Sequence, residues 1–321
     1  MTMDVVTWSL FIAAVLRVAT PILLAAVGGL ISEIGGVPNI TLEGSMLSGA
    51  CAGALTAGLT GSPWLGLIAA VVAGVVPGII LGVLAIEFKA DPIVVGIGVN
   101  LLAAGATTFA VYTLLGDKSG TSSLGRTELP SVDVPAAEGV PFLGNVLFGQ
   151  HILTYFAFLA WGVIAFLLAR SRYGMHVRAV GSNPLAAQSV GISVRRTQYS
   201  VVIIAGALCG IGGAFLSMGY VSSFLRDMTA GRGFIAVAAI FLGGMRPLGV
   251  LLAALAFGFF EALSIRLGNF DVPSQLVQAI PYAATLVGLG IFAYRDVRRR
   301  RTALYGPAPR RRRQRQPQLA R

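Results

Sequence analysis

The feature that most constrains this chain is a series of apolar runs long enough to cross a lipid bilayer, among them 5–30, 64–86 and 199–220. A crossing helix needs about 20 mostly apolar residues. Inside hydrocarbon its backbone groups must be satisfied within the segment, which favours helices. Charged residues make up only 12% of the chain, against about 25% in an ordinary soluble domain. The sequence predicts an all-α polytopic membrane protein whose residues 1–294 form one transmembrane domain.

One long polar interruption, residues 170–196, is basic throughout. It holds five arginines and His176, and it contains no acidic residue. Positive charge between membrane-spanning helices stays on the cytoplasmic side. The loop 170–196 is therefore predicted to be cytoplasmic. The loop 116–149, with four acids and two basic residues, is predicted to lie outside.

These two loops set the predicted topology. Counting the runs gives about nine transmembrane helices, with eight or ten as alternatives, an N-terminus outside and a C-terminus in the cytoplasm. The count requires two crossings from 231–267, with an inward turn at 243–247, and a last one at 276–294. The tail 295–321 carries eleven of the 24 basic residues. We expect it to be disordered and to face anionic lipid headgroups rather than nucleic acid.

Within the basic loop the sequence predicts a short helix over Pro184–Val190. Asn183 can cap its start, Pro184 suits its first turn and Gly191 can end it in the left-handed conformation. About two turns are not stable alone in water, so flanking helices or a partner must hold this helix. It is either an ordinary connector or a docking element for a soluble protein.

Three polar residues at membrane depth are candidates for a solute pathway: Asn39, Glu43 and Asn100. Asn39 and Glu43 lie in a broken stretch, 32–44, whose glycines and Pro38 cannot sustain a helix. Irregular backbone at depth is tolerated only where protein buries it or where it lines a wet cavity. Structural alternatives remain open. Asn100 can instead make an interhelical hydrogen bond, and Glu43 can favour a helix N-terminus.

Charged residues within the apolar runs need partners. Arg17 should face a cavity, pair with an acid or reach the membrane surface. The sequence offers Arg17–Glu43 and Arg266–Glu261 as pairs. Small residues serve packing instead, since Gly206, Gly210 and Gly213 allow helices to approach closely.

Several classes of chemistry lack a signature. No Gly-x4-Gly-Lys-Ser/Thr phosphate loop occurs, and no metal-ligand spacing or nucleophile–base pair is present. Cys51 and Cys209 lie in apolar runs, where they are expected to pack rather than pair. We expect no catalytic residue, no metal and no cofactor.

Four segments in order resemble one known family: GGVPNITLEGSMLSGA (35–50), DPIVVGIGVNLLAAG (91–105), AVGSNPLAAQSVGISVRR (179–196) and GRGFIAVAAIFLGGMRPLGVLLAALAFGFFEAL (231–263). They resemble the permease subunits of ATP-binding cassette (ABC) importers for simple sugars and nucleosides. These belong to the larger branched-chain amino acid and ribose permease family. The NITLEG form is closer to the nucleoside and simple-sugar branch.

The resemblance implies a four-part importer in a bacterial cytoplasmic (inner) membrane. Its other parts would be a second and often different permease, an ATPase that binds the ATP, and an extracytoplasmic substrate-binding lipoprotein. The loop 170–196 would hold the coupling helix that docks into the ATPase. The residues it assigns to this contact are Gly181, Asn183, Pro184, Leu185, Ala186, Ala187, Val190, Gly191 and Ile192. The alternative is an ion-coupled secondary transporter, which would favour a repeated pair of broken helices; one broken stretch stands out in this sequence.

Overall fold

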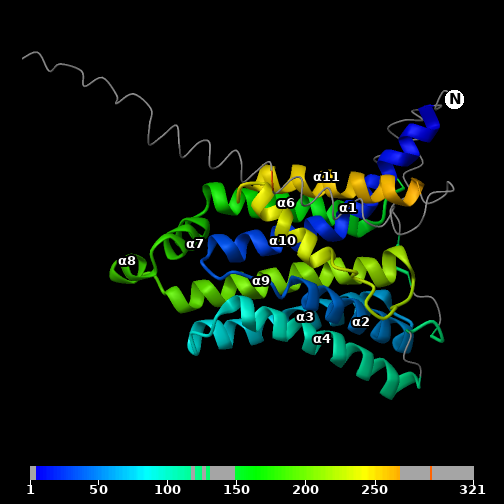
Figure 1. Ribbon diagram of the computed structural model, residues 1–321, viewed down its shortest axis with the longest axis horizontal. Coiled ribbons are helices and arrows are strands. Elements are labelled where there is room, and N and C mark those ends of the chain that lie inside the picture. The colour runs from blue at the N-terminus through cyan, green and yellow to red at the C-terminus, as the bar shows by residue number, and fades with distance from the viewer. Residues whose placement is uncertain (1–4, 117–119, 125–127, 131–148, 268–289, 291–321) are drawn as a thin grey trace, which may run out of the picture.

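The computed structural model describes residues 5–116, 120–124, 128–130, 149–267 and 290, and these are almost entirely helical (Figure 1). Within them the only strand-like pairing is an isolated bridge between Gly120 and Leu225. The helices are α1 (Val5–Ile34), α2 (Leu42–Thr60), α3 (Pro63–Gly82), the π-helical turn η1 (Val83–Glu87), α4 (Pro92–Leu115), α6 (Ile152–Arg170), α7 (Arg172–Ser182), α8 (Pro184–Ser189), α9 (Val194–Phe215), the π-helical turn η3 (Leu216–Tyr220), α10 (Arg232–Leu242) and α11 (Pro247–Leu267).

Six of these helical segments are long and apolar enough to cross a membrane: Thr7–Ile34, Pro63–Glu87, Pro92–Leu115, Ile152–Arg170, Val194–Tyr220 and Pro247–Leu267. The all-helical, multi-pass class is thereby confirmed. Helix α2 is not among the six, and its sequence contains Glu43 and several glycine, serine and threonine residues. Helix α10 has 11 residues, which span about 16 Å. The predicted crossing at 276–294 and the tail 295–321 lie outside the described residues, apart from Gly290, so the count of nine stays a prediction.

Helix α9 lies at the centre of the bundle, and glycines line its contacts with α2 and α3 (Figure 1). A Cβ on Gly210 would lie 2.3 Å from the Ala70 carbonyl oxygen, and one on Gly213 would lie 2.0 Å from the Met46 carbonyl oxygen. Real Cβ atoms cannot approach so closely. The prediction that these glycines allow close helix approach is confirmed, and small residues act here as they do in other membrane bundles.

The break after the first helix is shorter than the predicted 32–44. Helix α1 continues to Ile34 and α2 begins at Leu42, which leaves only Gly35–Thr41 irregular. Glycine and proline cluster in that shorter stretch. Glu43 and Gly44 instead fall in the first turn of α2, where an acidic residue is favoured by the helix dipole.

A turn is present at the predicted position in the second half, while its inward side and the two crossings that it would join stay predictions. Helix α10 ends at Leu242 and α11 begins at Pro247. Between them Met245 adopts a left-handed conformation with φ of 55°. The Trp161 indole on α6 donates a 2.7 Å hydrogen bond to the Pro247 carbonyl and fixes where α11 starts.

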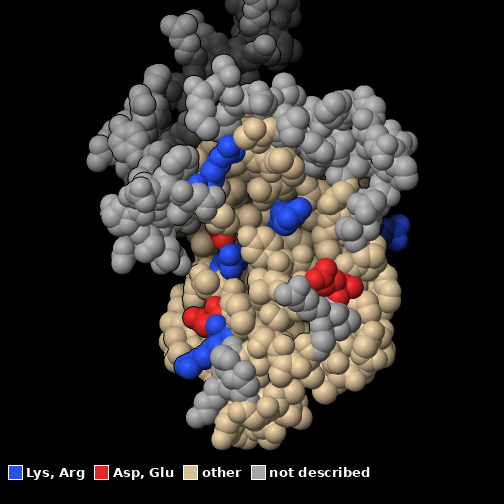
Figure 2. Space-filling model, turned by 90° about the vertical axis from the view of Figure 1, so that its right-hand side faces the viewer, with Lys and Arg blue, Asp and Glu red and all other residues tan. Residues whose placement is uncertain are grey.

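The two ends of the bundle differ in character. Helices α7 and α8 lie at one end, while the C-terminal end of α4 and the start of α1 lie at the other (Figure 1). Figure 2 looks onto this second end, where a few acidic and basic side chains lie close together on a mostly uncharged surface. The basic segment 170–196 and the connection between η3 and α10 are thus far apart.

We predict opposite effects for two glycine-to-alanine substitutions in helices. Gly210→Ala should lower the melting temperature of the purified protein in detergent, because the added methyl group overpacks the α3–α9 contact, at a cost of about 1–3 kcal/mol. Gly162→Ala on α6 is the control, since a Cβ there meets nothing within 4 Å. It should be neutral or slightly stabilising. Equal melting temperatures for both variants would contradict the close packing around α9.

Candidate functional site

Asn39 organises the irregular stretch between α1 and α2. Its side chain is 2% exposed, and its Oδ1 accepts hydrogen bonds from the Thr41 amide at 3.0 Å and the Thr41 hydroxyl at 2.7 Å. Just before this turn, the Ser32 hydroxyl donates to the Val37 carbonyl at 2.8 Å. Buried irregular backbone is therefore satisfied by nearby side chains.

Asn100 on α4 completes the start of α2 from another helix. Its Oδ1 accepts from the Gly44 amide and its Nδ2 donates to the Ile40 carbonyl, each at 2.9 Å. Thr41, at the cap position of α2, makes no capping bond with its own side chain. The amide of Asn100 takes that role, so the interhelical hydrogen bond considered for this residue is present.

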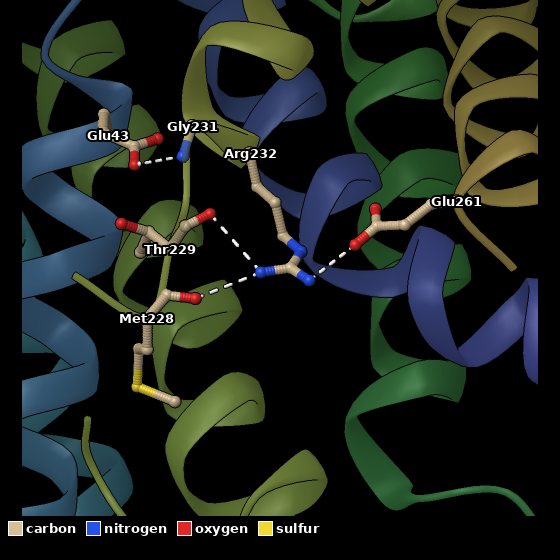
Figure 3. Close-up of polar contacts among 6 residues, drawn as sticks. All are labelled: Glu43, Met228, Thr229, Gly231, Arg232 and Glu261. Carbon is tan, nitrogen blue, oxygen red and sulfur yellow. Dashed lines mark hydrogen bonds and ion pairs between the residues drawn. The ribbon is translucent and has the colours of Figure 1, made fainter. Parts of the chain in front are cut away.

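Glu43 caps a third helix, α10 (Figure 3). Its two carboxylate oxygens accept from the Gly231 amide at 2.8 Å and the Gly233 amide at 2.6 Å. The carboxylate is 8% exposed. Free amides and the positive end of the helix dipole compensate its charge.

Two glycines make this contact possible. Gly231 has a φ of 80°, in the left-handed region that glycine adopts without strain. A Cβ on Gly233 would lie 2.4 Å from the Glu43 backbone nitrogen. Any larger residue at 233 would push α2 and α10 apart.

Glu261 on α11 pairs with Arg232 on α10, with 2.5 Å between Oε1 and the guanidinium (Figure 3). The guanidinium also donates to the carbonyls of Met228 and Thr229. The predicted pairs Arg17–Glu43 and Arg266–Glu261 are wrong. Arg266 lies over the Phe11 ring instead, with 5.7 Å from its guanidinium carbon to the ring centroid.

The structure thus brings Asn39, Glu43 and Asn100 together around the start of α2, and each side chain binds backbone groups. Their role in solute binding stays a prediction. Sequence reasoning missed Arg232 and Gly233. An arginine that opens an apolar helix after a glycine needs an acidic partner, but the sequence alone does not say which acid.

The basic segment forms two helices, and the second matches the predicted short helix except that it ends at Ser189. The Asn183 Oδ1 accepts from the Ala186 amide at 3.0 Å, and Gly191 has a φ of 83°. Leu185 and Val190 are 79% and 73% exposed, whereas Ala187 is 3% exposed. Two apolar side chains therefore project from the end of the bundle, and Ala187 faces inward.

Gly181, at the end of α7, packs against the end of α1. A Cβ there would lie 1.9 Å from the Ile34 carbonyl oxygen and 3.0 Å from the Gly36 nitrogen. Tyr173 on α7 is hydrogen-bonded to Ser200 on α9 at 2.7 Å. Burial raises the pKa of the Tyr173 hydroxyl, and this hydrogen bond partly opposes the rise. These contacts fix α7 to the bundle.

Arg17 lines a cavity of about 420 Å³ together with Glu128 and His151. Of the three alternatives given for Arg17, the structure shows the cavity. His151 caps α6 through Nδ1, which accepts from the Leu153 amide at 3.2 Å. Burial lowers the pKa of His151, which favours its neutral form.

Among the described residues, no group of three or more His, Cys, Asp or Glu side chains could hold a metal ion.

The fold and these buried contacts define a polytopic helical membrane protein. Residues 11–289 match the family model described as "Branched-chain amino acid transport system / permease component", and the chain belongs to this family of ABC transporter permeases. This membership favours the importer interpretation over the ion-coupled one. No solved structure matches the chain significantly.

Three named relatives cover most of the chain. It is 36% identical to the guanosine ABC transporter permease protein NupQ of Bacillus subtilis and 32% identical to the nucleoside ABC transporter permease protein NupC of Lactococcus lactis, each over 89% of this chain and 93% of the relative. It is 35% identical to the putative glucose ABC transporter permease protein TsgC13 of Haloferax volcanii, over 79% of this chain and 76% of the relative.

We predict that Glu43→Gln destabilises the protein by about 1–3 kcal/mol. A carboxamide has one acceptor oxygen, so its NH2 group would face one of the two amide donors of α10. The measurement is the thermal unfolding midpoint in detergent. Glu87→Gln is the control, because Glu87 forms an ion pair with an exposed arginine, and such pairs contribute about 0–1 kcal/mol. A wild-type midpoint for Glu43→Gln would contradict the capping role.

Proposed function

We propose that this chain is a permease subunit that forms part of the solute pathway of an ABC importer, with a nucleoside as the solute. The observation that carries the proposal is the similarity over 89% of the chain to relatives named for guanosine and for nucleosides. A simple sugar is the second candidate solute, because a third relative is named for glucose. Uptake of labelled guanosine, uridine and glucose by a deletion strain complemented with the complete transporter distinguishes the two.

The proposed assembly has three other components: a second permease subunit, an ATPase and an extracytoplasmic substrate-binding lipoprotein. In this proposal the chain is not catalytic and binds no cofactor, since ATP binds to the partner ATPase.

Exposed apolar surface on this chain supports the presence of a neighbouring permease subunit. Helix α4 is the least buried of the six candidate spans, and its Val94 and Leu101 are 69% and 70% exposed.

The proposed topology has nine crossings of a bacterial cytoplasmic membrane, with the N-terminus outside and the C-terminus inside. The end of the bundle with α7 and α8 is its cytoplasmic end. Arg172, Arg178, Arg195 and Arg196 lie at this end, and all four are exposed. An exposed basic cluster beside spanning helices is retained on the cytoplasmic side.

In the proposed complex α8 is the docking helix for the ATPase. Exposed Leu185 and Val190 enter a groove of the ATPase, while Asn183, Pro184 and Gly191 fix the shape and direction of the helix. Ala187 supports α8 from within. The exposure of Leu185 supports this proposal. Leu185 is among the most exposed apolar side chains at this end of the bundle, so a soluble protein that binds there would contact it.

The orientation predicts the labelling of two engineered cysteines. A cysteine at Ser123 should react with a membrane-impermeant thiol reagent added outside intact cells, and one at Ser182 should react only after the membrane is permeabilised. Wild-type Cys51 and Cys209 are buried, so background labelling should be low. Reversed labelling would overturn the proposed orientation.

We also predict that Leu185→Arg prevents the ATPase from co-purifying with the permeases from detergent, because it places a charge in an apolar groove. The variant should reach the membrane in normal amounts, since Leu185 is 79% exposed. Leu185→Met keeps an apolar side chain of similar volume and should behave as wild type. Normal ATPase recovery with Leu185→Arg would make α8 a connector only.

A further inference from the structure

A cavity of about 610 Å³ opens beside the C-terminal half of α4, at the end of the bundle away from α8. Its lining includes Thr108, Phe109 and Tyr112 from α4, and Arg226 and Asp227 from the connection between η3 and α10. The volume falls within the range of about 300–1,000 Å³ that is usual for small-molecule sites.

The lining combines aromatic rings with one acidic and one basic side chain. Phe109 and Tyr112 are three residues apart on one helix, so they lie on the same face, and they are 69% and 48% exposed. Exposed rings stack on planar bases, whichever base is present. Asp227 offers two acceptors for base N–H groups or ribose hydroxyls, and Arg226 offers donors for ring nitrogens and carbonyl oxygens.

Two buried contacts hold the charged residues in place, one on each side. On the upstream side, the Phe224 amide donates to the Thr121 hydroxyl at 2.9 Å, and the Thr121 amide donates to the Phe224 carbonyl at 2.9 Å. On the downstream side, the Gly231 amide is bound by Glu43. Between these contacts Asp227 has a φ of 57°. Such strained backbone persists only where the surroundings determine it.

We propose that this cavity is a nucleoside-binding site on the outward half of the permease. The base stacks on Phe109 and Tyr112, while Asp227 and Arg226 bind its polar edge or the ribose hydroxyls. Glu43 acts as a positioning residue, because its bond to Gly231 holds the segment that carries Asp227. The inference rests on the proposed function and adds the residues that contact the solute.

The α4 residues beside the two rings are small. Next to Thr108 the lining continues with Ala104 and Gly105, and a Cβ built on Gly105 meets nothing within 4 Å. The space beside the rings is therefore open. A flat ring system can enter it edge-on and reach the ring faces.

Protection from thiol labelling tests the site directly. Thr108→Cys is introduced into the complete transporter in membrane vesicles, and its reaction rate with a small maleimide is measured with and without guanosine. Saturating guanosine should slow the reaction at least about threefold, and glucose should not. Thr60→Cys is the control, because Thr60 is exposed at the same end of the bundle but outside the cavity. Its rate should be unchanged by either solute.

Uptake by side-chain variants gives a second readout. Tyr112→Ala should reduce the rate of guanosine uptake at least about fivefold, the lower end of what loss of one base–aromatic stack costs. Tyr112→Phe keeps the ring and should stay near wild type. Asp227→Asn should reduce guanosine uptake as well. Leu114→Ala, on the same helix and outside the lining, is the matched control, and all variants are compared at equal membrane levels.

The outcomes separate the two proposals. Guanosine uptake by wild type, with no protection of Thr108→Cys and normal uptake by Tyr112→Ala, would leave the proposed function standing and overturn the site. Uptake of glucose but not of guanosine by wild type would overturn the nucleoside assignment itself, and the site with it. If Tyr112→Ala does not reach the membrane, the protection experiment and Asp227→Asn decide.

Discussion

The structure depends on one buried carboxylate, that of Glu43, and the two backbone amides that bind it. A helix leaves its first amides without internal partners, and inside a membrane water cannot supply acceptors. Helix α10 begins against the first turn of α2, and its Gly233 amide is buried there. The carboxylate of Glu43 satisfies the Gly231 and Gly233 amides at 2.8 and 2.6 Å. Burying the Glu43 carboxylate alone or the unpaired amides of α10 alone would cost free energy. The hydrogen bonds between them reduce both costs.

The same solution recurs around α2. Asn100 supplies the acceptor that the first turn of α2 lacks, and Asn39 folds back onto Thr41 to shape the turn before it. The half-buried ion pair Arg232–Glu261 then joins α10 to α11. Helices that begin within the bundle are thus fixed by side chains from other helices. This explains why polar residues cluster next to the irregular stretch Gly35–Thr41.

A structural feature could be predicted from the sequence when the residues that determine it are close together along the chain. The short helix after Asn183 and its end at Gly191 were predictable, because caps and left-handed glycines are local signals. The close packing at Gly210 was predictable as well, since small residues have few other uses in a spanning helix. The partner of Glu43 was not, because it is a backbone amide 188 residues away and amides occur at every position. The predicted ion pairs failed for a related reason: several arginines were available, and only the fold selects Arg232.

A continuous series of contacts connects the two ends of the bundle, from α7 through the end of α1 and the start of α2 to the start of α10. Gly181, at the end of α7, packs directly on the end of α1 beside Gly36. The irregular stretch leads from there to Glu43, and Glu43 holds the start of α10. The segment with Asp227 ends at that point and lines the cavity beside α4. The close contacts of Gly181 leave little space between α7 and the end of α1. Glu43 is the residue that connects the helix after the irregular stretch to the segment that carries Asp227.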